Sequence, residues 1–277
     1  MLSIFTGYFI ELILLFLFVL AHELGHLLMA KQFAWKIKEL KLLPFGGVLI
    51  VDDAHGTTAK EECLVACAGP IQNLILILLA WVFGQLHWLP YEWMQYMIQA
   101  NMLLIIFNLL PISPLDGGKI VQAALSLVLS YFYTLKVITW LSIVCSFLMI
   151  VYALTYSVWH HTAGPQLNLL LVGIFLFSDN LTRLKHLPYL LYRFILHRGK
   201  MLKQMHVTES VNEAVPIIVY EEQTLFSLFK KIKRESHHLF YCITNKDKQV
   251  KVKTEQHIIE SFINSSHLNR ALIDIFD

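Results

Sequence analysis

Residues 12–30 read LILLFLFVLAHELGHLLMA, and this stretch decides both the class of the protein and the place of its chemistry. An uncharged run leads into His22-Glu23-Leu24-Gly25-His26, and apolar residues resume at Leu27. On a helix, His22 and His26 lie about 40° apart on one face, so both imidazoles can bind one metal ion. Glu23 projects to the side, where it can reach a water molecule on that metal. Ionisable groups at membrane depth are costly and mark a functional site.

A catalytic zinc ion needs three protein ligands and an open fourth position for water. His22 and His26 supply two ligands, so the third has to come from elsewhere in the chain. Taken alone, the motif also fits a helix end with two interfacial histidines. The zinc hypothesis therefore depends on finding a third ligand.

The composition places the chain among membrane proteins. Hydrophobic residues make up 56% of the sequence, charged residues 15%, and the mean hydropathy is +0.57, whereas soluble proteins carry about 25% charged residues. Of the 22 lysines and arginines, 15 lie between Arg183 and Arg270. We therefore expect a membrane-embedded metalloprotease domain over 1–182, a basic linker over 183–206 and a soluble domain over 207–277.

Stretches with few charges predict the transmembrane spans, because a helix needs about 20 residues to cross a bilayer. The expected spans are residues 8–30, 63–88, 94–110, 137–159 and 166–181. Residues 120–135 are more polar, and we interpret them as an interfacial or partly buried helix. The predicted fold class is a polytopic α-helical membrane protein with about five transmembrane helices and a small cytoplasmic α+β domain.

The loop charges predict the orientation of the chain. Lysines gather in the loop 31–62 and around Asp116, and basic residues are frequent in the C-terminal domain, whereas the loops 89–93 and 160–165 contain no Lys or Arg. By the positive-inside rule, the basic regions face the cytoplasm. We therefore expect a multi-pass protein of the cell membrane with an external N-terminus and a cytoplasmic C-terminal domain. Residues 1–8 have no basic n-region, so a cleavable signal peptide is not expected.

The third ligand is predicted to be Asp116, in the stretch Phe107-Asn108-Leu109-Leu110-Pro111-Ile112-Ser113-Pro114-Leu115-Asp116-Gly117-Gly118. Its prolines cannot continue a helix, and Gly117-Gly118 permits positive φ. Non-helical backbone at membrane depth persists only where it is buried in protein or lines a wet cavity. We therefore expect Asp116 on an irregular turn near the cytoplasmic face, at the depth of the two histidines. Two histidines and a carboxylate suit a catalytic zinc ion.

These motifs together resemble the site-2 protease family of intramembrane zinc metalloproteases. The resemblance rests on HExxH in a membrane helix and on a later N-x-x-P-x-x-x-x-D-G run, and it covers essentially the whole chain. It extends to Leu42-Leu43-Pro44-Phe45-Gly46-Gly47 and to Ala68-Gly69-Pro70 with Asn73. Within the family, these motifs resemble those of a sporulation branch, whose members activate a sigma-factor proprotein.

The family core usually has about six spans, the first of which precedes the HELGH helix. Only 21 residues precede His22, so this first span has no sequence to form it. A natural short form and a start site placed too far downstream both fit this difference.

The resemblance implies a role for each site residue. His22, His26 and Asp116 are the expected ligands of one zinc ion, and Glu23 is the expected general base, which takes a proton from water and returns it to the leaving amine. The expected substrate-binding residues are Asn108, Pro114, Gly46 and Gly47. For Asn108, a hydrogen bond between helices is the alternative.

Residues 43–51 favour a bent extended segment over a helix, because Pro44 and Gly46-Gly47 precede the run Val48-Leu49-Ile50-Val51. A strand edge can hold an extended peptide substrate by β-augmentation. In the family this region is a membrane-associated sheet or a re-entrant loop, and an ordinary cytoplasmic hairpin is the alternative. His55 is expected to be a solvated loop residue.

The C-terminal domain reads as strand, helix, strand, strand and helix, over 217–220, 224–234, 239–243, 250–252 and 256–263. The periodicity supports a small α+β domain, and the family resemblance implies one cystathionine-β-synthase (CBS) motif. A single CBS motif exposes a face that pairs with a second motif, so we expect a homo-oligomer through this domain and ATP as a regulator. The basic run 230–234 fits phosphate binding, and a solvated or lipid-facing helix is the alternative.

The sequence thus predicts an intramembrane zinc endopeptidase for regulated intramembrane proteolysis, and no nucleic-acid partner. The expected substrate is a membrane-associated sigma-factor proprotein, with inhibitory membrane proteins as further partners, on the mother-cell side of the forespore membrane. An anti-sigma factor is the alternative substrate. The alternative outside enzymes is a membrane metal-binding or transport protein, although a transporter places liganding groups in several spans near the bilayer midplane.

Overall fold

The computed structural model describes the chain in eight stretches, which are residues 9–35, 37–43, 46–51, 57–160, 166–204, 214–220, 223–243 and 250–265. The chain divides into two compact units. The first consists of Met1–Ala123 and Leu141–Ser178, and the second of Ala124–Trp140 and Asp179–Asp277.

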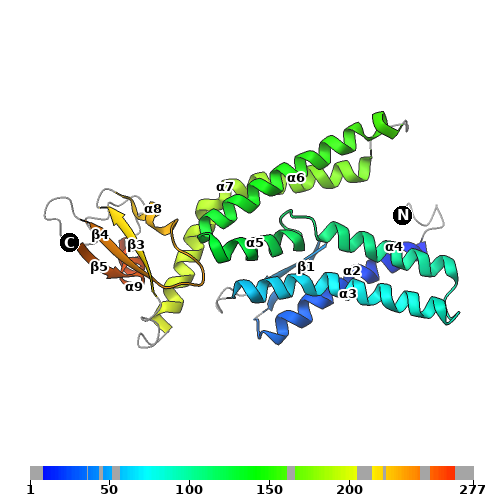
Figure 1. Cartoon of the computed structure of the whole chain (residues 1–277), viewed down its shortest axis with the longest axis horizontal. Coiled ribbons are helices and arrows are strands. Elements are labelled where there is room, and N and C mark those ends of the chain that lie inside the picture. Colours follow the sequence, from blue (N-terminus) through cyan, green and yellow to red (C-terminus); the bar gives the residue numbers. More distant parts are fainter. Residues whose placement is uncertain are drawn as a thin grey trace. The chain divides into compact units, whose positions relative to one another are not determined.

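Helices dominate the described residues (Figure 1). The long ones are α2 (Phe9–Gln32), α3 (Ala59–Gln85), α4 (Tyr91–Asn108), α5 (Asp116–Val128), α6 (Tyr131–His160) and α7 (Leu167–Gln204). Among the described residues, α2, α3, α6 and α7 are long and apolar enough to cross a membrane. The chain is therefore a multi-pass membrane protein, and within the described residues four of the five predicted spans meet this criterion.

Polar residues explain the difference in the number of spans. The predicted span 94–110 does form a helix, α4, but this helix begins with Tyr91-Glu92 and carries Gln95, Gln99 and Asn101 along its length. The segment 120–135 was also predicted incorrectly at its end. It contains most of α5, which stops at Val128, and α6 already begins at Tyr131.

Helices α2, α3 and α4 pack in sequence order, α3 lying against both of the others (Figure 1). A capping box starts α3, because Thr58 Oγ1 accepts the backbone N–H of Glu61 while Glu61 Oε2 accepts that of Thr58. Gly25 allows α2 and α3 to approach closely. A Cβ atom on Gly25 would lie 2.7 Å from the carbonyl oxygen of Ala68.

Strands β1 (Ile37–Leu43) and β2 (Gly46–Val51) form an antiparallel pair, in which Gly46 lies opposite Leu43 and Gly47 opposite Leu42. This pairing confirms the predicted extended conformation of residues 46–51. Strand β2 contacts α2, the helix that carries HELGH. His55 lies outside the described residues.

The second unit contains a three-stranded sheet in the order β3-β4-β5, from β3 (Val215–Tyr220), β4 (His238–Ile243) and β5 (Val250–Thr254). Strand β3 pairs parallel with β4, and β4 antiparallel with β5. Helices α8 (Leu225–Phe229) and α9 (Glu255–Ser265) complete this part of the unit. The small α+β domain is thus observed, whereas its identity as a CBS motif stays a prediction.

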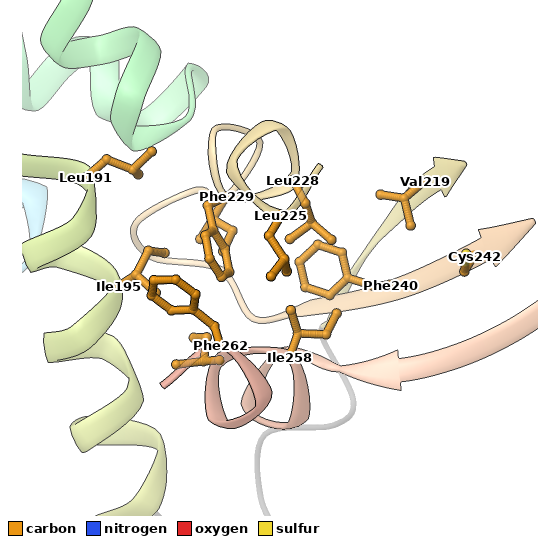
Figure 2. Packing of buried hydrophobic residues seen from close by; sticks show 12 residues of the cluster. Leu191, Ile195, Val219, Leu225, Leu228, Phe229, Phe240, Cys242, Ile258 and Phe262 are labelled. Atoms are coloured by element: carbon orange, nitrogen blue, oxygen red, sulfur yellow. The ribbon is translucent and has the colours of Figure 1, made fainter. Parts of the chain in front are cut away.

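One face of this sheet carries the hydrophobic core of the second unit. Figure 2 shows Val219, Phe240 and Cys242 of the strands turned toward side chains of α8, α9 and α7. The helical members of this core are Leu225, Leu228, Phe229, Ile258, Phe262, Leu191 and Ile195. Helix α8 is shorter than the predicted 224–234, since it ends at Phe229 and turns lead to the next strand.

A buried ion cluster links α7 to this domain. Arg198 of α7 binds the carboxylate of Glu255 through Nε and Nη2, and its Nη1 donates to the carbonyl oxygen of Arg234 at 2.6 Å. Glu255 also accepts from His238, through the ring Nδ1 at 3.1 Å and the backbone N–H at 3.2 Å. Each of these three side chains is at most 11% exposed.

We expect this cluster to make the second unit sensitive to acid. Burial alone would raise the pKa of Glu255, but the hydrogen bond with His238 and the charge of Arg198 hold that pKa below its usual range. A carboxyl group with a lowered folded-state pKa adds stability above its unfolded pKa of about 4.3, and this stability is lost as pH falls toward the folded-state value. Reaction of the buried Cys242 with 2,2′-dithiodipyridine, which still reacts with thiols in acid, should therefore accelerate below pH of about 4 in the full-length protein, relative to the denatured protein at the same pH.

The variant Arg198→Met should show faster alkylation of Cys242 already at neutral pH, because loss of one partner from a buried ion pair costs about 3–5 kcal/mol. Lys231→Met is the matched control, since the Lys231 side chain is exposed. Equal protection of Cys242 in Arg198→Met and Lys231→Met would contradict a stabilising role for the cluster.

Candidate metal centre

Three side chains from distant parts of the sequence converge in the first unit. Nε2 of His22 and Nε2 of His26 lie 3.1 Å apart, and each lies 3.0 Å from Oδ2 of Asp116. All three residues are buried, with at most 5% of each exposed. Among the residues that the structure describes, they form the one group of three or more His, Cys, Asp or Glu that could hold a metal ion.

The size and chemistry of this group fit zinc. Ligand atoms at 2.0–2.1 Å from a tetrahedral zinc ion lie about 3.3 Å apart, close to the 3.0–3.1 Å found here. The two imidazole rings stand at 83° to each other, so their nitrogen atoms approach one point without stacking of the rings. Two imidazoles and one carboxylate also form a donor set that catalytic zinc sites use.

Hydrogen bonds orient two of the three donors. Nδ1 of His26 lies 2.7 Å from the carbonyl oxygen of Val65, which can only accept, so Nδ1 carries the proton and Nε2 is left to bind metal. Oδ2 of Asp116 lies 3.0 Å from both Nε2 atoms, and its Oδ1 accepts from the Lys119 ammonium at 3.1 Å, which favours the charged carboxylate. The carboxyl group is therefore ionised, as a metal ligand requires.

Gly69 of α3 makes room for the two histidines. A Cβ atom at this position would lie 2.3 Å from Nε2 of His26 and 2.6 Å from Nε2 of His22. Any side chain here would displace the donor atoms. Gly69 was expected only as part of a family motif, and its place in the site was not predicted. A glycine in an apolar helix indicates close packing, but the sequence alone does not show which helix packs against it.

The turn before α5 places Asp116 in the site. Asp116 is the first residue of α5, and the backbone N–H of Ser113 in the preceding turn donates to Ser142 Oγ at 2.8 Å. The predicted irregular conformation of Asp116 was wrong, because the irregular turn ends at Leu115. Gly117 and Gly118 are helical and are needed for close approach, not for positive φ: Cβ atoms there would lie 2.1 Å from the Leu109 carbonyl oxygen and 2.7 Å from that of Ile112.

The remaining predicted site residues lie outside the donor group. Glu23 follows His22 in α2 and is buried. Asn108 is the half-buried last residue of α4, and Pro114 lies in the turn before Asp116. Gly46 and Gly47 belong to β2. The catalytic and substrate-binding roles of these residues stay predictions.

The arrangement is suited to hydrolysis. A bound zinc ion would polarise a peptide carbonyl group and make a water molecule more acidic. The protein supplies a buried, preorganised donor set, with one carboxylate, Glu23, adjacent in sequence to a donor.

Comparison with known proteins identifies the family. Residues 10–90 and 85–152 match the sequence profile of Peptidase family M50. The chain belongs to peptidase family M50. It is 27% identical to stage IV sporulation protein FB of Bacillus subtilis (strain 168) over 279 residues, which cover 99% of this chain and 91% of that protein. It is 35% identical to a zinc metalloprotease of Methanocaldococcus jannaschii over 128 residues, 45% of this chain and 37% of that protein.

A solved structure agrees with this assignment. The site-2 protease from Methanocaldococcus jannaschii superposes with a TM-score of 0.52 and 28% sequence identity, covering 66% of this chain and 82% of that chain. The M50 chain is thus an intramembrane zinc metallopeptidase of the site-2 protease type. A non-enzymatic metal-binding or transport protein, the alternative left open by the sequence, does not agree with these findings.

Zinc binding should be sensitive to any side chain at position 69. Gly69→Ala should lower the zinc content of the purified protein, because its Cβ atom would press on both Nε2 donors. Gly84→Ala in the same helix is the matched control, since its Cβ atom would meet the flexible side chain of Met94 at 2.1 Å. Metal analysis after dialysis tests this prediction, and equal zinc content in the two variants would contradict it.

Proposed function

We propose that His22, His26 and Asp116 bind the catalytic zinc ion of this M50 peptidase. The observation that supports this assignment is the buried triangle of donor atoms with sides of 3.0–3.1 Å. No other protein donor group is needed, because a catalytic zinc site keeps its fourth position open.

Glu23 is the general base of the proposed reaction. Its carboxylate takes a proton from the attacking water and returns it to the leaving amine, which splits the peptide bond into an acid and an amine. Asn108, Pro114, Gly46 and Gly47 contact the substrate in this proposal. Pairing of β1 with β2 gives an extended edge near α2, which supports capture of the substrate peptide as an added strand.

The proposed substrate is a membrane-associated sigma-factor proprotein that is activated during sporulation. Support comes from the similarity to stage IV sporulation protein FB along 91% of that protein. Sporulation then places the enzyme in the forespore membrane, with its C-terminal domain in the mother-cell cytoplasm and inhibitory membrane proteins as partners. The loop charges support this orientation. An anti-sigma factor is the second candidate substrate.

The proposed roles separate metal binding from chemistry. Glu23→Gln should retain zinc and lose cleavage, because an amide cannot take up the proton. His22→Phe, His26→Phe and Asp116→Ala should lose both, because each removes one of three donors. Zinc analysis of the purified variants, together with co-expression with candidate sigma-factor proproteins, measures the two properties.

A Glu23→Gln enzyme that cleaves at a rate near that of the wild type would exclude the general-base role. An Asp116→Ala protein with a normal zinc content would remove Asp116 from the ligand set. Cleavage of an anti-sigma factor, with no cleavage of any sigma-factor proprotein, would change the substrate and leave the chemistry intact.

The second proposal is that two chains associate through the open face of the sheet in the C-terminal domain, as a CBS-like module would. Along the strands, alternate residues turn away from the core, and this outer face carries no charge. Its residues are Pro216, Ile218, Tyr220, Leu239, Tyr241, Ile243, Val250, Val252 and Thr254. Ile218 is 56% exposed and Val252 50%. An apolar surface of this kind is typical of an interface, and two such sheets can pack face to face.

The predicted regulation by ATP rests on the resemblance alone. Of the basic run 230–234, the Lys230 ammonium lies over the rings of Phe226 and Phe132, at 4.2 and 5.1 Å from their centroids. The Arg234 carbonyl oxygen accepts from Arg198. These contacts give the run a structural role and lend no support to phosphate binding.

The interface proposal predicts the effect of a charge on the open face. Ile218→Asp should convert a dimer into a monomer, because burial of an unpaired carboxylate opposes association. Lys200→Glu is the control, since Lys200 is an exposed residue of α7 outside the sheet and its substitution also adds a negative charge. Light scattering of the detergent-solubilised full chain measures the mass. A wild-type chain that is monomeric at all concentrations would refute the interface.

A further inference from the structure

Lys119 binds the second oxygen of Asp116. The carboxylate presents Oδ2 to both histidine nitrogens, at 3.0 Å each, and its Oδ1 lies 3.1 Å from the Lys119 ammonium. The two oxygens of one carboxylate thus have different partners. Lys119 can reach Asp116 because the two residues are three positions apart on one face of the first turn of α5.

The first turn of α5 has little room for side chains other than these two. Gly117 and Gly118 pack so closely on Leu109 and Ile112 that Cβ atoms would overlap with backbone atoms. Lys119 is the first residue after Asp116 that can carry a long side chain. Its charge is also unfavourable at a helix N-terminus, where the macrodipole favours anions. The pairing with Asp116 offsets this cost.

Stability alone does not account for the pair. Lys119 is 46% exposed while the Asp116 side chain is 5% exposed, and ion pairs with an exposed partner contribute little to folding. The consequence for metal binding is larger. A carboxylate with one oxygen held by an ammonium group offers only the other oxygen to a metal ion, whereas a free carboxylate can bind through both.

We propose that Lys119 is a positioning residue, which holds Asp116 as a monodentate zinc ligand through Oδ2. This proposal rests on the ligand set proposed above. A second bond from Oδ1 would take up coordination space that a catalytic zinc site leaves open for water and substrate. Lys119 therefore lets Asp116 bind the metal ion through one oxygen and leaves a coordination position open for water and substrate.

The test compares metal coordination in three full-length variants purified in detergent. Lys119→Met removes the ammonium group and retains the aliphatic stem, Lys119→Arg retains a cationic donor, and Lys136→Met is a matched control on the exposed surface of α6. Each protein is loaded with Co²⁺ in place of zinc, and its visible absorption spectrum reports the coordination number. Zinc affinity is measured separately by competition with a chelator.

We expect Lys119→Met to lose the intense absorption of four-coordinate Co²⁺ and to bind zinc about 10–100-fold more weakly, as for loss of other groups that orient metal ligands. Lys119→Arg and Lys136→Met should keep the wild-type spectrum and affinity. The proposal is wrong if Lys119→Met has the wild-type spectrum, whatever its affinity, or if Lys119→Arg matches Lys119→Met.

Asp116→Ala, measured in parallel, separates this inference from the ligand assignment on which it rests. Wild-type zinc affinity in Asp116→Ala would overturn the ligand set itself. Loss of zinc in Asp116→Ala together with wild-type behaviour of Lys119→Met would overturn only the role of Lys119. Thermal unfolding of the metal-free proteins checks that Lys119→Met remains folded, and a melting temperature equal to that of Lys136→Met is expected.

Discussion

Close contact between α2 and α3 is the constraint on which the metal centre depends. Two imidazoles can share one metal ion only if nothing else occupies the space between their nitrogen atoms and the neighbouring helix. Gly25 lets the α3 backbone approach α2, and Gly69 leaves the space next to both Nε2 atoms. The Val65 carbonyl oxygen then lies within hydrogen-bond distance of His26. Small residues at helix contacts are common in membranes because they permit such approach.

Polar side chains in an apolar helix bundle have to satisfy one another, since unpaired polar groups are costly there. Oδ2 of Asp116 lies 3.0 Å from Nε2 of each histidine, Lys119 donates to its Oδ1, and His26 donates through Nδ1 to the Val65 carbonyl oxygen. His22 contributes Nε2 to the same group, while its Nδ1 has no hydrogen-bond partner among the described atoms. A metal ion would replace direct contact between the three donors by shared coordination, which explains why such a costly cluster persists in this fold.

The sequence predicts the position of a site residue well when its partners are close in the chain, and poorly when they are distant. The positions of His22 and His26 follow from helical spacing alone. Asp116 is 90 residues from His26, so periodicity cannot bring them together, and the prediction relied on proline and glycine chemistry and on a family motif. The role of Gly69 could not be deduced, because the register of α2 against α3 is a tertiary property. Gly117 and Gly118 were recognised as special, but for a backbone angle instead of a close approach.

The fold shows the same limit. Long apolar stretches predicted α2, α3, α6 and α7, whereas α4 contains enough polar residues to differ from them. The apolar and aromatic run 239–243 predicted β4, and in the structure its residues alternate between the buried and the open face of the sheet. The end of α8 at Phe229 was not predictable from helix propensity. Tertiary contacts determine the backbone conformation of Lys230 and Ile232 instead, because the Ile232 carbonyl oxygen accepts the backbone N–H of Tyr131.

The C-terminal domain also packs against the start of α6. Tyr131 stacks on Phe194 of α7 with ring centroids 4.0 Å apart, and Ser130 Oγ donates to the Lys230 carbonyl oxygen. The start of α6 is therefore part of the second compact unit, together with residues 179–277. Helix α5 precedes this start by two residues and carries Asp116 at its other end. A truncation that removes the C-terminal domain would also take away the partners of Ser130 and Tyr131. Loss of activity in such a truncation would not distinguish regulation from disturbance of α5 and its metal ligand, whereas point substitutions on the open face of the sheet leave these contacts in place.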